Sequence, residues 1–90
     1  MEPARRTFEV QNRLGLHMRA AAMLVQTANK YDAQVTITKD GQSVDGKSII
    51  SLMMLAAAQG SVIEIEAVGS QAEELLDALG ALFDRKFDEE

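Results

Sequence analysis

The 90-residue sequence predicts an α+β fold formed by one domain, residues 1–90, with the element order βαββαβα. The spacing of its apolar residues alternates between the period of 2 that is typical of strands and the period of 3.6 that is typical of helices. The strand-like segments have one polar face, so only the other face of their sheet needs cover. We therefore expect an open-faced sandwich: a four-stranded, mainly antiparallel sheet with three helices on one face.

The first half of the chain predicts a strand, a helix and a hairpin. The segment RRTFEVQ alternates Phe8 and Val10 with polar residues, as a half-buried strand does. The segment HMRAAAMLVQTANKY changes to helical spacing. Its apolar stripe consists of Ala21, Leu24, Val25, Ala28 and Tyr31. Two further strands follow, with Val35 and Ile37 facing inward and Asp40-Gly41 as the hairpin turn.

The second half predicts a helix, a strand and a final helix. The second helix of the chain is expected over 48–59, with Ser48 as its N-cap and Gly60 just past its end. The segment SVIEIEAV alternates apolar residues with glutamates and predicts a strand with one wet face. Ser70 and Glu73 have the spacing of a capping box at the start of the last helix. The apolar stripe of that helix consists of Ala72, Leu75, Leu76, Leu79, Leu82 and Phe83.

Composition excludes several classes of function. The chain is 47% hydrophobic, has a net charge of −5, contains no cysteine and has a single histidine. The acidic balance and few aromatics argue against nucleic acid as a partner, and the missing ligands argue against a metal or another cofactor. No apolar run is long enough to span a bilayer and the first residues do not form a signal peptide. We expect a cytoplasmic monomer that does not bind membranes.

The segment GQSVDGKS, residues 41–48, matches the phosphate-loop pattern G-x-x-x-x-G-K-[ST]. A true phosphate loop follows a parallel strand in a sheet covered by helices on both faces, and a second strand supplies an Asp for magnesium. Here the first glycine belongs to the predicted hairpin turn, and no such Asp follows an apolar strand. A nucleotide enzyme is therefore the weaker interpretation of this motif.

The single histidine, His17, lies where the first helix is expected to begin. A lone histidine there is often a cap or an ordinary surface residue. The free N–H groups and the positive end of the helix dipole, however, favour a neutral imidazole and attract an anion. Such an imidazole is nucleophilic and able to carry a phosphoryl group, and Arg19 adds a cation for the phosphate oxygens.

The predicted second helix has more apolar residues than one buried face needs. If Leu52, Leu55 and Ala56 point to the core, further apolar side chains remain on other faces. These are Ile49, Ile50, Met53 and Met54. Either the helix is deeply embedded or it presents an apolar patch to a partner, a role that methionine suits because it repacks easily.

The segments GLHMRAA (15–21) and GKSIISLMMLAAAQG (46–60), with the βαββαβα order, resemble the histidine-containing phosphocarrier family, HPr, of the bacterial phosphoenolpyruvate-dependent phosphotransferase system. The resemblance covers essentially the whole chain. It implies that His17 accepts a phosphoryl group on Nδ1 from enzyme I and passes it to enzyme IIA proteins, with Arg19 beside it. It also implies that Ser48 is the target of a serine kinase/phosphorylase in some bacteria. The expected partner-binding residues are Met18, Ala22, Ile49, Ile50 and Met53.

Two positions depart from the family pattern Gly-Leu-His-Ala-Arg-Pro-Ala. Ala20 replaces the proline but is a strong helix former, so we expect the helix to persist. Met18 replaces a small residue beside the histidine and bears on the choice of partner. The second-helix segment and the ending FDRKFDEE also resemble the nitrogen-regulatory branch of the system, so both branches stay open. A phosphoryl carrier is the main hypothesis, with a non-covalent binding module and a nucleotide enzyme as the alternatives.

Overall fold

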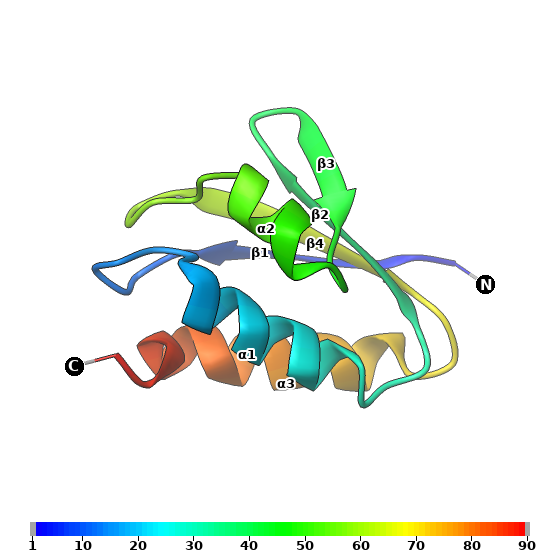
Figure 1. Cartoon of the computed structure of the whole chain (residues 1–90). Helices are drawn as coiled ribbons and strands as arrows, with labels where there is room; N and C mark the ends of the chain where they lie inside the picture. Colours follow the sequence, from blue (N-terminus) through cyan, green and yellow to red (C-terminus); the bar gives the residue numbers. More distant parts are fainter. Residues whose placement is uncertain (1, 90) are drawn as a thin grey trace.

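The computed structural model describes residues 2–89 and has the predicted order of strands and helices (Figure 1). The elements are β1 (Ala4–Glu9), α1 (Met18–Ala28), β2 (Gln34–Lys39), β3 (Gln42–Asp45), α2 (Ile49–Met54), β4 (Val62–Val68), α3 (Ala72–Asp84) and the short 3-10 helix η1 (Lys86–Asp88). The βαββαβα prediction is therefore confirmed, and η1 adds one turn after the last predicted helix.

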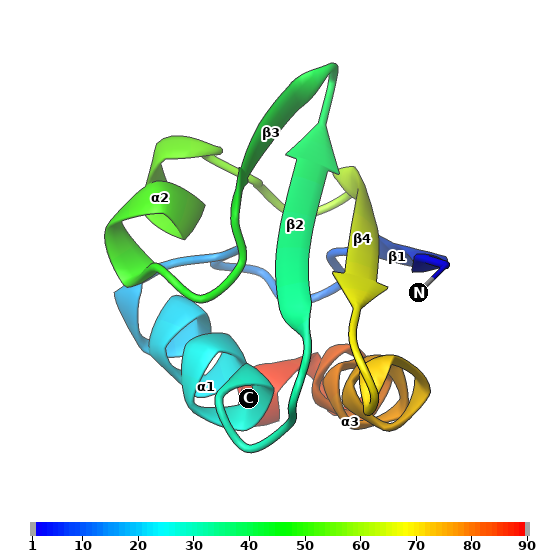
Figure 2. The same cartoon turned by 90° about the vertical axis from the view of Figure 1, so that its right-hand side faces the viewer.

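The four strands form one antiparallel sheet in the order β1-β4-β2-β3. Along β4 the side chains alternate: Ile63 and Ile65 are fully buried, whereas Glu64 is exposed. The three helices cover the apolar face (Figure 2). The opposite face carries exposed polar residues. The open-faced sandwich is confirmed, and its physical cause is the period-2 alternation read from the strands.

Helices α1 and α3 pack side by side, and α2 packs against α1 and the β3 edge (Figures 1 and 2). Every apolar residue predicted for the stripe of α3 is buried. The stripe of α1 is also buried as far as Ala28. Tyr31 lies beyond the end of that helix and is half-buried against the core, so its inclusion in the helix was wrong. Ala20 is fully buried in α1, and the helix forms without a proline there, as expected.

The second helix is shorter than predicted. It ends at Met54 rather than at Gln59, and Ala56 has a positive φ of 51° and an exposed side chain. The physical reason is a competing tertiary contact, because the carbonyl of Ala57 accepts a hydrogen bond from the amide of Leu16. Leu52 and Leu55 are buried as predicted, but Ala57 takes the core position expected of Ala56. Gly60 lies in the turn before β4 and does not end the helix.

The predicted capping box of α3 was also wrong. The N-cap of α3 is Gln71, which makes no side-chain cap hydrogen bond. The hydroxyl of Ser70 instead donates a 2.8 Å hydrogen bond to Oδ2 of Asp32. The side-chain oxygen of Gln71 accepts a hydrogen bond from the amide of Asp32. Both side chains therefore join the start of α3 to the loop after α1, a long-range contact that sequence spacing cannot reveal.

The phosphate-loop motif forms a hairpin and a helix start. Asp40 and Gly41 have φ values of 51° and 81°, and they form the two-residue turn between β2 and β3. The residues that would have to wrap an anion instead form β3, which pairs with β2. Lys47 donates to the carbonyl of Tyr31 through Nζ at 3.3 Å. This geometry leaves the motif without the open loop that a nucleotide phosphate requires.

Candidate functional site

His17 is the N-cap residue of α1, at the end of a loop whose path is fixed by backbone contacts. Gly15 has a φ of 68°, and a Cβ at this position would collide with the carbonyl oxygen of Ala57. The amide of Leu16 donates to that same oxygen at 2.9 Å. The close approach requires glycine, and it sets the entry of the chain into α1.

The first turn of α1 provides backbone donors. The carbonyl of His17 accepts a 2.8 Å hydrogen bond from the amide of Ala21, the first hydrogen bond of the helix. The N–H groups of Met18, Arg19 and Ala20 have no carbonyl acceptor four residues earlier within the helix. The side chain of His17 does not cap them. Arg19, in this same turn, has an exposed side chain. The helix start thus combines free donors, the positive dipole end and an exposed cation.

The imidazole of His17 is oriented with one nitrogen covered. Its side chain is 25% exposed, yet Nε2 is buried and makes no hydrogen bond to the described residues. Nε2 lies 3.6 Å from Oε2 of Glu89, which is longer than a hydrogen bond. A shallow pocket of about 230 Å³ adjoins the ring, lined by Leu14, Leu16, His17, Ala56, Ala57 and Ala58. Nε2 is therefore the covered nitrogen of the ring.

Glu89 reaches the histidine from the C-terminal end of the chain, and its side chain is only 8% exposed. Its carboxylate accepts hydrogen bonds from Asn12 Nδ2 at 3.1 Å and from the amide of Leu14 at 3.0 Å. Burial raises the pKa of this carboxyl, but the bonds from Asn12 and from the amides of Leu14 and Arg13 outweigh that effect, with a smaller contribution from His17. The pKa of Glu89 therefore lies below its ordinary value, and the group is ionised at neutral pH.

Glu89 is held in place by an aromatic anchor. Phe87 is 1% exposed and packs edge-on against Phe83 with ring centroids 5.0 Å apart, and Phe83 stacks on Phe8 at 4.8 Å. Lys86, Phe87 and Asp88 all have φ between 53° and 57°. Such left-handed backbone costs about 1–2 kcal/mol at each residue other than glycine. Burial of the Phe87 ring offsets part of that cost.

An exposed apolar patch surrounds the start of α1 and the outer side of α2. We call these residues the apolar patch: Leu14, Met18, Ile50, Met53 and Met54. Their exposed fractions run from 39% at Met53 to 75% at Ile50. Among the predicted partner-binding residues, Met18, Ile50 and Met53 lie in the patch, whereas Ala22 and Ile49 are half-buried and Ile49 packs against the core. The surplus of apolar residues in this segment therefore lies mainly at the surface.

Ser48 is half-buried at the start of α2 and accepts a hydrogen bond from the amide of Ser51 through Oγ at 3.3 Å. Its role as the N-cap is confirmed. It lies directly before Ile49 and Ile50, so a group attached to its hydroxyl would lie beside the apolar patch. His17 and Ser48 are thus the N-cap residues of two helices that pack against each other, and Arg19 lies in the first turn of α1.

Two classes of site find no support among residues 2–89. No three His, Cys, Asp or Glu side chains in this range are grouped as ligands for a metal ion. None of the described helices is long and apolar enough to cross a membrane.

Sequence reasoning missed three residues of this site. Asn12 is 1% exposed and donates to both Gly15 O and Glu89, but a polar residue in a predicted loop gives no sign of burial. Glu89 lies 72 residues from His17 in a tail of mixed charge, and only the fold brings them together. Leu14 could not be assigned to the surface because one apolar residue in a loop has no periodicity that indicates its face.

Comparison with known proteins identifies the family of the chain. The family described as "PTS HPr component phosphorylation site" matches residues 4–85. The chain belongs to the HPr family. It is a phosphocarrier-type protein of the phosphotransferase system, as the resemblance of its histidine and serine segments implied.

Relatives within the HPr family carry the names HPr and NPr. The chain is 45% identical over 85 residues to "Phosphocarrier protein HPr" of Neisseria meningitidis, with 94% of this chain and 96% of the relative covered. It is 42% identical over 87 residues to "Phosphocarrier protein NPr" of Escherichia coli, with 96% and 97% covered. A crystal structure of HPr from Thermoanaerobacter tengcongensis superposes with a TM-score of 0.92 at 42% identity, covering 97% of this chain and 98% of that one. The same organism also supplies an HPr dimer structure, with a TM-score of 0.75 at 42% identity, covering 89% and 92%. The family match ends at residue 85, so the segment that carries Glu89 lies outside it.

Proposed function

We propose that this HPr-family chain is a phosphocarrier that takes a phosphoryl group from phospho-enzyme I on His17 and passes it to enzyme IIA proteins, serving sugar uptake, regulation or both. The observation that supports this most directly is the placement of His17: it is partly exposed, lies at the free N-terminus of an 11-residue helix and is bordered by an apolar patch. The residues 1–90 act as a single carrier domain in the cytoplasm. The chain turns over no small substrate of its own.

The reaction uses the lone pair of an imidazole nitrogen. In acceptance, Nδ1 of His17 attacks the phosphorus of the phosphorylated donor, and the bond between phosphorus and the donor atom breaks with its electron pair returning to the donor. In donation the same steps run toward the acceptor. The choice of Nδ1 rests on the covered position of Nε2, whose lone pair or proton faces Glu89 rather than solvent.

The helix start is suited to a phosphoryl group on His17. The N–H groups of the first turn and the dipole of α1 attract the dianion, and Arg19 is free to pair with its oxygens. These donors are already oriented before the group arrives, so little reorganisation is needed during transfer.

The apolar patch provides the docking surface for the protein partners. Its methionines adapt to more than one partner, which a carrier between enzyme I and several enzyme IIA proteins requires. We further propose that phosphorylation of Ser48 by a serine kinase/phosphorylase regulates this docking, because the added dianion would lie beside the patch. The carrier acts as a monomer and needs neither a metal nor a bound cofactor.

Transfer of a labelled phosphoryl group tests the proposal. The chain is incubated with labelled phosphoenolpyruvate and enzyme I, and the label on wild type should be acid-labile and base-stable, as expected of phosphohistidine. His17→Ala should carry no label yet keep its fold, because the side chain fills no core position and makes no cap hydrogen bond. Ser48→Ala is the matched control and should be labelled as wild type is.

The same assay separates the alternatives. A binding module without covalent chemistry would take no label, and a nucleotide enzyme would take label from ATP without enzyme I. Full carrier activity in His17→Ala would overturn the assignment. Transfer from the labelled chain to purified enzyme IIA of the sugar branch and of the nitrogen branch, compared by rate, then decides which branch it serves.

A further inference from the structure

The methionines of this chain are distributed unevenly between its core and its surface. Four of the five lie within residues 2–89: Met18, Met23, Met53 and Met54. The buried apolar residues of that range are valine, leucine, isoleucine, alanine and phenylalanine, and none is methionine. Met18, Met53 and Met54 are instead exposed, by 65%, 39% and 67%. Methionine therefore provides much of the apolar patch and none of the buried core in this range.

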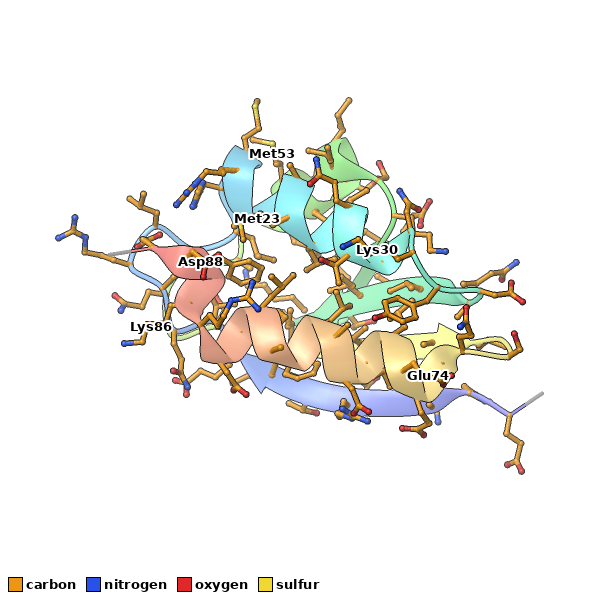
Figure 3. The ribbon with its side chains drawn as sticks, turned by 90° about the horizontal axis from the view of Figure 1, so that it is seen from below. Met23, Lys30, Met53, Glu74, Lys86 and Asp88 are labelled. Atoms are coloured by element: carbon orange, nitrogen blue, oxygen red, sulfur yellow. The ribbon has the colours of Figure 1, made fainter. Side chains whose placement is uncertain are left out.

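Met23 differs from the methionines of the apolar patch. It is half-buried in α1 and packs against the core. Figure 3 shows Met23 between the ribbons of α1 and α3, whereas Met53 lies at the outer edge of the molecule. A small oxidant dissolved in water therefore reaches the sulfur atoms of the patch more readily than the sulfur of Met23.

The chain has no thiol that would react with an oxidant first. It contains no cysteine, so the methionine thioethers are its only sulfur atoms. Oxidation of a thioether to a sulfoxide converts a flexible apolar side chain into a polar, chiral one. In this chain such a change falls mainly on the exposed methionines, where it alters the surface without entering the core.

We propose that Met18, Met53 and Met54 form a reversible modification site for hydrogen peroxide, and that their oxidation weakens docking at the apolar patch while the fold persists. The thioether sulfur attacks one peroxide oxygen, and a sulfur–oxygen bond forms as the oxygen–oxygen bond breaks. The released hydroxide takes the proton from the sulfur-bound oxygen and becomes water. Each sulfur loses two electrons, and the peroxide is reduced.

The sulfoxides act on docking rather than on the chemistry at His17. Each sulfoxide oxygen binds water that must be removed when a partner covers the patch, and it gains no assured hydrogen bond in return. The reaction is reversed by methionine sulfoxide reductases, one for each sulfoxide epimer. In that reversal two thiols become a disulfide and the oxygen leaves as water. The inference rests on the proposed docking of enzyme I at the apolar patch.

Mass spectrometry of the peroxide-treated chain tests the selectivity of the modification. Trypsin cleaves after Arg13, Arg19 and Lys30, so Met18 and Met23 fall in separate peptides, 14–19 and 20–30. Met53 and Met54 share the peptide 48–85 and are distinguished by fragmentation. During a time course, oxygen should be added to the three patch methionines several-fold faster than to Met23. Equal or faster oxidation of Met23 would overturn the proposal.

Transfer kinetics test the consequence, after catalase has removed the peroxide. Oxidised wild type should accept from phospho-enzyme I with a KM about tenfold higher than untreated wild type and with nearly the same kcat. A triple variant, Met18→Leu with Met53→Leu and Met54→Leu, is compared with itself before and after treatment, and its KM should not change. Met23→Leu is the matched control, because its KM should rise on treatment as that of wild type does. Both reductases with a dithiol should restore the KM of oxidised wild type.

Met1 is common to all these proteins, so its oxidation does not affect the comparison. Oxidised wild type should keep its Tm within a few degrees, and loss of the fold would overturn the proposal. A KM that stays constant when wild type is oxidised, that rises equally in the triple variant, or that the reductases fail to restore would overturn it too. Untreated wild type that takes no label would overturn the proposed function itself, whereas a labelled chain that is insensitive to oxidation would overturn this inference alone.

Discussion

The amide of Leu16 donates a 2.9 Å hydrogen bond to the carbonyl of Ala57, joining the residue before His17 to the segment that follows α2. This contact links two regions that are 41 residues apart in the chain, residues 16 and 57. Helix α2 carries Ile50, Met53 and Met54 of the apolar patch. The loop before His17 is therefore joined directly to the segment that follows this helix.

Gly15→Ala should break this arrangement. A Cβ at Gly15 would meet the carbonyl oxygen of Ala57, and the φ of 68° is itself unfavourable for alanine. A left-handed backbone outside glycine costs about 1–3 kcal/mol, and the collision adds to it. We expect a lower free energy of unfolding in urea and slower phosphoryl acceptance by His17.

Gly41→Ala is the matched control. Gly41 also has a positive φ, of 81°, but a Cβ there would meet nothing within 4 Å. It should lose stability through backbone strain alone and transfer the phosphoryl group at the wild-type rate. Equal loss of transfer in both variants would contradict the role given to the Gly15–Ala57 contact.

The sequence predicts the fold well wherever a local pattern decides it. Alternation in β4 and the helical stripe of α3 correspond to buried faces because each is set by spacing along one segment. The hairpin at Asp40-Gly41 follows from the left-handed backbone that such a turn needs. Ser48 was recognised as a cap for the same local reason.

Predictions from the sequence are less accurate where distant segments compete for the same groups. The residues after Met54 have good helical propensity, but the Leu16 amide and the burial of Ala57 favour an irregular path. Ser70 and Gln71 similarly bond to Asp32 instead of capping α3. The proximity of Glu89 to His17 could not be predicted because the two residues share no local pattern.

Acidification should weaken the attachment of the tail. The pKa of Glu89 is lower in the folded chain than its ordinary value of about 4.3. A depressed pKa contributes stability above the ordinary value, and that contribution is lost as the pH falls through the folded pKa. The Tm of wild type should exceed that of Glu89→Gln by a few degrees at pH 7, and the difference should vanish in strong acid.

The Tm of both proteins is measured by circular dichroism at pH values from 7 down to strong acid. Glu89→Gln has no titrating group at this position, so the difference between the two Tm curves isolates the carboxyl. A difference that grows on acidification would show that the carboxyl is not stabilised by Asn12 and Leu14.

Arg19→Ala should slow transfer more than it lowers stability. The side chain is exposed in the first turn of α1, and its proposed partner is a phosphate that is present only transiently. A hydrogen bond to a charged group contributes about 1.5–3 kcal/mol, so acceptance and donation should each slow by about tenfold or more. Rapid-quench kinetics with phospho-enzyme I measure both rates.

Arg5→Ala is the control for general electrostatic attraction. Arg5 pairs with Glu66 at 2.8 Å on the open face of the sheet, away from His17. It should leave both rates near those of wild type. A sharp fall in the Tm of Arg19→Ala with unchanged rates would instead assign Arg19 a structural role.

Ser48→Asp should separate folding from docking. The Ser48 hydroxyl caps α2 by accepting from Ser51, and an aspartate carboxylate caps equally well and interacts favourably with the helix dipole. The Tm should therefore stay within a few degrees of wild type. The charge, however, lies beside the apolar patch and would have to lose its water when a partner covers Ile50 and Met53.

We expect acceptance from enzyme I to weaken at least several-fold in Ser48→Asp, seen as a higher KM. Ser43→Asp places the same charge on β3 outside the patch and should transfer normally. Lys47→Ala should also transfer the phosphoryl group at the wild-type rate, because the ammonium group of Lys47 donates to the carbonyl of Tyr31 rather than to a phosphate. Micromolar ATP binding that disappears in Lys47→Ala would restore the nucleotide interpretation of GQSVDGKS. Unchanged kinetics in Ser48→Asp would remove α2 from the docking surface, since a buried interface cannot accept an unpaired charge without loss of affinity.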